Sequence, residues 1–79
     1  MPRYFFHVSH NSTHPDTEGT ELSDIYAAQA EAVLLCGEMI REIDNTFWES
    51  PLWQLRVTSQ DQRLLFTLTF SGEEGAATI

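Results

Sequence analysis

Three stretches of the chain alternate between apolar and polar side chains, as half-buried β-strands do. They cover residues 3–9, 52–59 and 63–70, and the short stretch 20–22 is a further candidate for an edge strand. The two later stretches flank the polar segment QDQ and therefore predict a hairpin. The face predicted to meet the core carries Tyr4, Phe6, Val8, Trp53, Leu55, Val57, Leu64, Phe66, Leu68 and Phe70.

The opposite face of these strands is polar and carries most of the positive charge. Alternation assigns to it Arg3, Phe5, His7, Gln54, Arg56, Thr58, Arg63, Leu65, Thr67 and Thr69. Two apolar side chains, Phe5 and Leu65, would then be exposed beside arginines, a combination that is common in interface cores. The alternative is a solvated sheet stiffened by cross-strand pairs. We predict a partner-binding surface made of Arg3, Phe5, His7, Arg56, Arg63 and Leu65.

Between the second and third strand candidates, residues 22–45 carry apolar side chains at helical spacing. Ser23 or Asp24 can cap the start of this helix. Gly37, inside it, indicates either a close backbone approach or a tolerated cost of about 1 kcal/mol. Leu34 and Leu35 flank the acidic face, so the apolar arc is wider than one sheet requires. The stripe predicted to be buried contains Ile25, Ala28, Ala32, Val33, Cys36, Met39, Ile40 and Ile43.

Together these elements predict an α+β domain in the order β-β-α-β-β. One helix covers one face of a small antiparallel sheet of three to four strands. The short strand is expected to pair with the first and the hairpin to continue the sheet, in the order 2-1-3-4. The predicted domain spans residues 1–70, and the small, acidic residues 71–79 are expected to form a flexible tail.

Composition narrows the function classes without identifying a reaction. A formal net charge of −8 argues against nonspecific binding to DNA, because phosphates would be repelled. One cysteine excludes an internal disulfide, and no apolar run approaches the roughly 20 residues of a membrane helix. The first residues lack the apolar core of a signal peptide. We therefore expect a cytoplasmic protein with no membrane contact.

Residues that could carry out chemistry do not form a recognisable motif. His7, His10 and His14 stand near Asp16, and imidazole with carboxylate can bind zinc or nickel. Their spacing is not that of a helical metal motif, and ordinary polar residues at a strand end are the favoured interpretation. Cys36 falls on the predicted buried stripe, where a thiol is inert. The sequence predicts no enzyme, no catalytic residue, no metal ligand and no cofactor.

Several segments resemble a known family. They are MPRYFFHV, PDTEGTELSD with its Asp16, Glu18, Gly19, Glu21, Leu22 and Asp24, AAQAEAVLL, FW and WQLRVTSQDQRLLFTLTF. The chain is similar from Met1 to about Phe70 to small bacterial proteins, common in rhizobia and their relatives, that form a domain of unknown function. The resemblance implies no activity. Two features depart from the family pattern: QDQ stands where glycine is usual, and His10 and His14 are not part of it.

Three functions follow as hypotheses. The first is a small protein-interaction or regulatory module, homodimeric through the sheet face, a sheet edge or the flank at Leu34 and Leu35, or bound to another protein. The second is single-stranded nucleic acid on the open sheet, with Phe5 stacking on a base and arginines near phosphates, which the net charge opposes. The third is metal or small-molecule binding at the histidine-rich loop. The interaction module is favoured.

Overall fold

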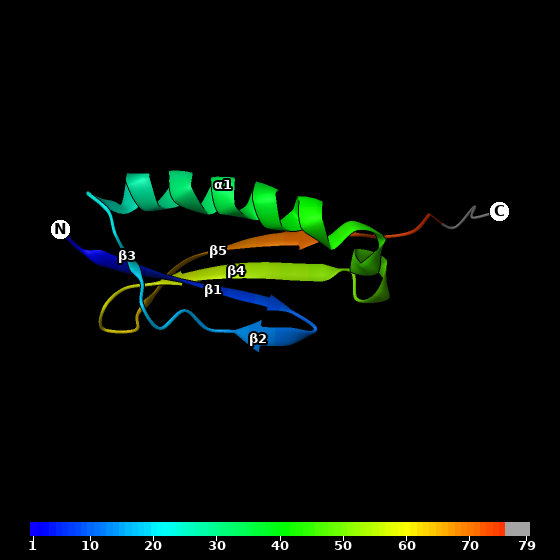
Figure 1. Cartoon of the computed structure of the whole chain (residues 1–79), viewed down its shortest axis with the longest axis horizontal. Helices are drawn as coiled ribbons and strands as arrows, with labels where there is room; N and C mark the ends of the chain where they lie inside the picture. The colour runs from blue at the N-terminus through cyan, green and yellow to red at the C-terminus, as the bar shows by residue number, and fades with distance from the viewer. Residues whose placement is uncertain (76–79) are drawn as a thin grey trace.

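The chain folds into an antiparallel sheet with one long helix on one of its faces (Figure 1). The structure is a computed structural model, and it describes residues 1–75. In chain order the elements are β1 (Arg3–His10), β2 (Ser12–His14), β3 (Thr20–Glu21), α1 (Ile25–Ile43), the 3-10 helix η1 (Asp44–Glu49), β4 (Leu52–Thr58) and β5 (Leu64–Ser71). The predicted α+β class is confirmed, and the sheet has five strands within the described residues.

The strands are ordered β2-β1-β4-β5, and β3 pairs with β1 on the same side as β2. The predicted order is confirmed, because the short strand β3 pairs with β1 through Arg3 and Glu21, and β4 and β5 follow on the other side. The additional strand is β2, which the sequence interpretation had left in a loop. It forms because Asn11, at φ 69°, turns the chain in the left-handed region that asparagine tolerates.

Helix α1 begins after Asp24, whose carboxylate accepts a hydrogen bond of 2.9 Å from the Ala27 N–H. Ala28 and Ala32 are fully buried, because their small side chains let the helix lie close to the sheet. Val33 is 61% exposed, so its predicted place in the core is wrong. A Cβ added at Gly37 would meet nothing within 4 Å, which excludes a close approach within the described chain.

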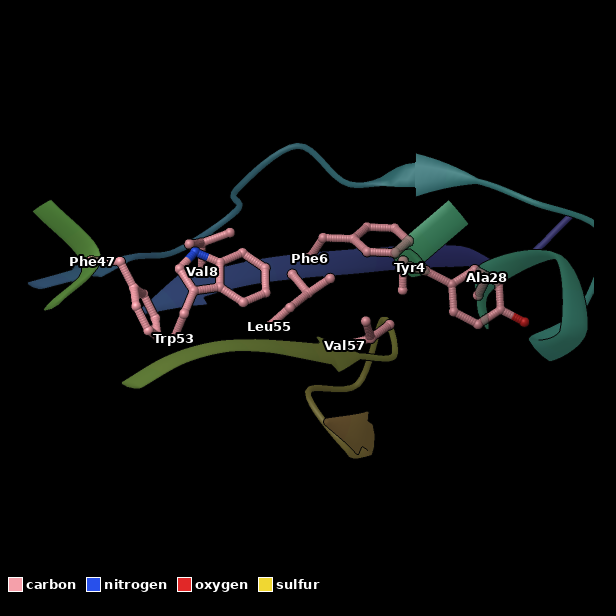
Figure 2. Packing of buried hydrophobic residues seen from close by; sticks show 9 residues of the cluster. Tyr4, Phe6, Val8, Ala28, Phe47, Trp53, Leu55 and Val57 are labelled. Atoms are coloured by element: carbon pink, nitrogen blue, oxygen red, sulfur yellow. The ribbon is translucent and has the colours of Figure 1, made fainter. Parts of the chain in front are cut away.

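The core lies between α1 and the sheet, and its residues come mainly from the two central strands (Figure 2). Burying a large apolar side chain contributes roughly 1.5–3 kcal/mol, so these residues supply most of the stabilising burial. From η1, Phe47 closes one end of the core, and the His10 ring stacks on it with centroids 5.7 Å apart. The cluster contains Tyr4, Phe6, Val8, Ala28, Ala32, Phe47, Trp53, Leu55 and Val57.

A β-bulge at the start of β5 reverses two predicted positions. Val57 pairs with Phe66 but Thr58 pairs with Leu64, so Leu65 is an extra residue in β5. Leu65 packs against the core, whereas Leu64 is 55% exposed. The prediction that Leu65 belongs to the partner-binding face is therefore wrong, and so is the prediction that Leu64 faces the core.

The turn between β4 and β5 forms without glycine. Ser59 donates its N–H to the Arg63 carbonyl and accepts from the Gln62 N–H, both at 2.9 Å. Gln62 has φ 67°, the left-handed position that glycine usually takes in three-residue hairpin loops. Ser59 and Asp61 form a further side-chain hydrogen bond across the loop. A glutamine thus takes the conformation that glycine usually has in such loops.

The described chain stays attached to the domain beyond residue 70. Ser71 belongs to β5, and the Gly72 N–H donates to the Pro51 carbonyl at 3.1 Å. A Cβ at Gly72 would lie 2.9 Å from the Trp48 ring, so a glycine is needed there. Residues 76–79 of the predicted tail lie outside the described residues. Across residues 1–75, the one long helix falls short of the apolar character that spanning a membrane requires.

Candidate functional site

The sheet edge beside β1 is split, and a side chain fills the gap. β2 pairs with β1 from Val8 onward and β3 pairs with its first two residues, which leaves the Phe6 N–H between them. The Asp16 Oδ2 accepts from this N–H at 3.2 Å. Its Oδ1 accepts from the Glu18 and Gly19 N–H groups, each at 3.1 Å. One carboxylate therefore takes the place of a missing stretch of strand.

These contacts set the protonation state of Asp16. Partial burial raises the pKa of this carboxyl. Hydrogen bonds from the backbone of Gly19, Phe6 and Glu18, together with the nearby His7, lower the pKa by a larger amount. The net result is an Asp16 pKa below its ordinary value, because three N–H donors stabilise the charged form. The carboxylate is thus ionised at neutral pH, and both of its oxygens accept hydrogen bonds from the backbone.

The outward-facing imidazole of His7 is fixed by two hydrogen bonds. Its Nδ1 accepts from the Asp16 N–H at 3.0 Å, so Nδ1 carries no proton in this arrangement. Its Nε2 therefore carries the proton and donates to the Thr58 Oγ1 at 2.9 Å. Both ring nitrogens are engaged within the chain, which holds the ring across β1 and β4.

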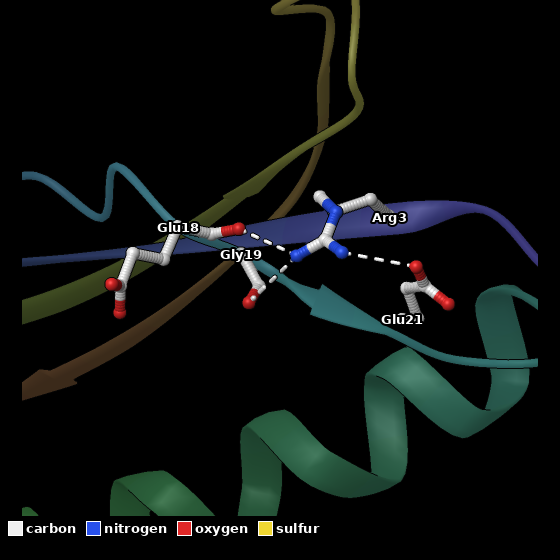
Figure 3. A network of polar contacts seen from close by, with 4 residues as sticks. All are labelled: Arg3, Glu18, Gly19 and Glu21. Atoms are coloured by element: carbon white, nitrogen blue, oxygen red, sulfur yellow. Dashed lines mark hydrogen bonds and ion pairs between the residues drawn. The ribbon is translucent and has the colours of Figure 1, made fainter.

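The Arg3 side chain is also engaged within the chain (Figure 3). Its Nη1 donates to the carbonyl oxygens of Glu18 and Gly19 at 2.7 and 3.3 Å, and its Nη2 forms a salt bridge of 3.0 Å with Glu21. The salt bridge is partly exposed and therefore contributes little stability by itself. The guanidinium holds the segment after Asp16 against β1.

The segment around Gly19 covers the Phe5 ring, which was expected to be open to solvent. A Cβ added at Gly19 would lie 2.8 Å from both the Phe5 ring and the Arg3 side chain. Gly19 also has φ +72°, so both space and backbone conformation require glycine here. Phe5 is consequently only partly exposed. It does not offer an open stacking platform.

A pocket of about 590 Å³ lies on the sheet face opposite α1, and we call it the outer-face pocket. Phe5 and Leu64 give it an apolar part, and Arg56 is its one cationic side chain. Arg56 is exposed and forms no salt bridge with any of residues 1–75. The lining comprises Phe5, His7, Asp16, Thr17, Arg56, Thr58, Ser59, Gln60, Gln62 and Leu64.

The structure brings together half of the predicted partner-binding residues. Phe5, His7 and Arg56 line the outer-face pocket, whereas Arg3 is bound beside it and Leu65 lies on the helix side. Arg63 is exposed and lies just before β5. Sequence reasoning considered Asp16 only beside the histidines and missed its hydrogen bonds to the backbone, although an aspartate two and three residues before Glu18 and Gly19 is a recognisable Asx-turn signal.

The three histidines do not converge. His7 faces the outer side of the sheet, whereas His10 stacks on Phe47 on the core side and donates from Nε2 to the Ser50 carbonyl at 3.0 Å. The Nε2 of His14 is hydrogen-bonded to the Ser12 hydroxyl at 3.0 Å. Within residues 1–75, no group of three His, Cys, Asp or Glu side chains has the geometry to hold a metal ion.

Residues 3–71 match a family described as "Domain of unknown function (DUF6894)". The chain belongs to this family. The DUF6894 match begins at the first residue of β1 and ends at the last residue of β5, so it includes both the outer-face pocket and the core. A search of curated proteins and a search of solved structures each found no match.

A second notable surface of this DUF6894 domain lies where α1 meets β5. Ile40 and Phe70 line a common hollow beside η1, so this side of the helix faces β5. Val33 lies seven residues before Ile40 and hence on the same side of the helix. Phe70 is 42% exposed and Val33 61%, while Phe66 and Leu68 are only partly buried. We call Val33, Ile40, Phe66, Leu68 and Phe70 the β5–α1 surface.

Proposed function

We propose that this chain is a non-enzymatic protein-interaction module that acts as a homodimer. The observation that carries the proposal is the β5–α1 surface, which remains partly uncovered although the helix already packs on the sheet. Partly uncovered apolar side chains on neighbouring elements are typical of interaction sites. A chain of 79 residues also gains proportionally more from association than a large domain does, because it buries less of its own surface.

We propose no enzymatic activity, because the polar groups of the outer face form hydrogen bonds within the chain. Both oxygens of Asp16 accept backbone hydrogen bonds, and both ring nitrogens of His7 are engaged. A general acid or base needs a free position toward a substrate. The proposed compartment is the cytoplasm, which is supported by the use of a single cysteine, Cys36.

The outer-face pocket is proposed as the contact for a second protein. Arg56, which forms no salt bridge within residues 1–75, provides a positive charge beside the apolar Phe5 and Leu64, and amide and hydroxyl side chains also line the pocket. This combination suits an acidic segment that carries an apolar side chain. Single-stranded nucleic acid is a weaker candidate, because the Phe5 ring is covered at Gly19 and the Arg3 guanidinium is bound to the chain.

Light scattering coupled to size exclusion, over a hundredfold range of protein concentration, tests the homodimer. We expect the mass to rise from that of one chain toward that of two as the concentration increases. Moderate salt should favour the dimer, because it screens the repulsion between two chains of net charge −8. A mass of one chain at every concentration, in both low and moderate salt, would contradict the proposal.

A further inference from the structure

The two edges of the sheet differ in how well they are protected. On the β1 side the edge is divided between the short strands β2 and β3, and Asp16 closes the gap between them. On the other side stands β5, eight residues long, with the sequence LLFTLTFS and neither a charge nor a proline. Natural edge strands are usually short or carry a charged residue or a proline, because an edge without these features can pair with strands of other chains.

The backbone groups that β5 offers can be identified from its ladder. The Gly72 N–H donates to Pro51, and the register pairs Phe70 with Trp53 and Leu68 with Leu55. Hydrogen bonds to a neighbouring strand are made by every second residue of an antiparallel strand. Leu68, Phe70 and Gly72 therefore bond to β4, and the residues that alternate with them direct their N–H and C=O groups to the open edge. They are Thr67, Thr69 and Ser71. Within residues 1–75, β4 is the only strand that pairs with β5, so no strand accepts the groups that face the other edge.

The sequence of this edge is its own mirror image. Residues 66–70 read Phe-Thr-Leu-Thr-Phe in both directions. In an antiparallel pair centred on Leu68, each residue would stand opposite one of its own kind. A two-fold interface requires this self-complementarity, because both copies use the same patch. We propose that the second copy of this chain binds here, through β5 of each copy, in the register centred on Leu68.

This register gives both faces of the joined sheet matching contacts. On the helix side, Phe66 meets Phe70 of the second copy and the two Leu68 side chains meet each other, so the β5–α1 surfaces of both copies become continuous. On the opposite side, Thr67 meets Thr69. Aromatic pairs and threonine pairs are among the cross-strand combinations that stabilise antiparallel sheets. Half-covered phenylalanines are thereby removed from water.

Charge also agrees with this register. Arg63 precedes β5 and Glu73 follows it, at equal sequence distances from Leu68. The bulge at Leu65 shortens the path from Arg63 to Leu68 by about one residue, so the two-fold pairing brings Arg63 of each copy to within about one residue of Glu73 of the other. Both residues are exposed, and neither forms a salt bridge within residues 1–75. These contacts favour the antiparallel arrangement and offset part of the repulsion between two acidic chains.

The inference rests on the proposed homodimer, and two surface variants separate them. Thr67→Pro removes an N–H that faces the open edge and leaves the bonds to β4 in place, as edge prolines do. Leu34→Glu adds a charge on the outer surface of α1, where Leu34 is 66% exposed, away from β5. We expect Thr67→Pro to weaken the dimer at least roughly tenfold and Leu34→Glu to leave the dissociation constant within about threefold of wild type.

The register is tested by crosslinking in a Cys36→Ala background under mild oxidation. In the proposed pairing, two Leu68→Cys residues face each other as a non-hydrogen-bonded pair with Cα atoms about 4.5 Å apart, which permits a disulfide. Two Thr67→Cys residues would be offset along the strands, with Cα atoms about 8 Å apart, which is too far. Leu68→Cys should therefore form crosslinked dimer readily, and Thr67→Cys should not.

The possible results separate the two claims. A wild-type chain that stays monomeric overturns both the homodimer and this interface. A wild-type dimer that survives Thr67→Pro, or that is lost in Leu34→Glu alone, supports the homodimer and overturns the β5 pairing. Equal crosslinking of Leu68→Cys and Thr67→Cys, or none in either, overturns the register. Circular dichroism of each variant shows whether a lost dimer has left a folded monomer, which the inference requires.

Discussion

Asp16→Ala should destabilise the domain by about 2–5 kcal/mol, although Asp16 lies in a connection between strands. The substitution leaves the partly buried Phe6 N–H without an acceptor, which costs about 1–3 kcal/mol. The lost bonds to the Glu18 and Gly19 N–H groups add about 0.5–1 kcal/mol each, because water can replace them. This total is a large part of the stability of a small domain.

Urea unfolding at neutral pH, followed by tryptophan fluorescence, measures the effect, since Trp53 is 1% exposed in the folded chain. Protein concentration must be held constant, because association adds to apparent stability. Asp16→Asn is the matched control: its amide oxygen still serves Glu18 and Gly19, whereas its NH₂ group cannot accept from Phe6. It should lose about half as much as Asp16→Ala. A loss below about 0.5 kcal/mol in Asp16→Ala would refute the assigned role.

The same carboxylate predicts a pH dependence. The Asp16 pKa is lower in the folded chain than its ordinary value of 3.8, so the folded state favours the charged form. Its contribution is complete above that ordinary value and is lost as pH falls through the lower folded pKa. The stability difference between wild type and Asp16→Asn should therefore shrink between about pH 6 and about pH 2. A difference that stays constant over this range would contradict it.

Five further substitutions test the helix surface, the turn and the bulge. Gly37→Ala should stabilise by about 1 kcal/mol in thermal unfolding, because space is open there, and no gain would contradict this. Gln62→Gly should stabilise by about 0.5–1 kcal/mol by relieving the left-handed backbone, whereas Gln60→Gly, outside that region, should destabilise. Leu65→Lys should destabilise by at least about 2 kcal/mol and Leu64→Lys by less than about 0.5; the reverse order would contradict the bulge.

The class of fold could be predicted because its signals are local and regular. Alternation in β1 and β4 placed Tyr4, Phe6, Leu55 and Val57 in the core, and that placement is confirmed. The cap at Asp24 could also be predicted, since a short polar side chain before a helical stripe has one common use. The order of the strands followed from their lengths and from the helix between them.

The assignment of faces failed where the period is broken. A period of two, carried through β5, cannot detect the extra residue at Leu65. Because of this extra residue, Leu64 and Leu65 each lie on the face opposite to the predicted one, whereas the residues from Phe66 onward follow the predicted alternation. Val33 was assigned to the core because an apolar residue beside Ala32 fits a wide helical stripe. Small alanines bring the helix so close to the sheet that the buried arc is narrow, which leaves Val33 outside it.

The outer-face pocket could be predicted only in part, because a loop completes it. The alternation of β1 and β4 correctly placed Phe5, His7 and Arg56 on one face. No periodic pattern indicates that the segment around Gly19 returns across β1 and covers the Phe5 ring. Such folding depends on contacts distant in sequence, including the hydrogen bond from the Asp16 N–H to the His7 ring.

The split edge beside β1 also has a consequence for how far the protein can assemble. A sheet with two open edges can add neighbours at both and grow into a fibre, since each new copy presents another free strand. Here the Asp16 carboxylate and the short strands β2 and β3 interrupt one edge, so β5 is the longest continuous edge within residues 1–75. In the proposed dimer both β5 edges are used, and we therefore expect growth by edge pairing to stop at two copies, with the Asp16 contact helping to prevent filament formation.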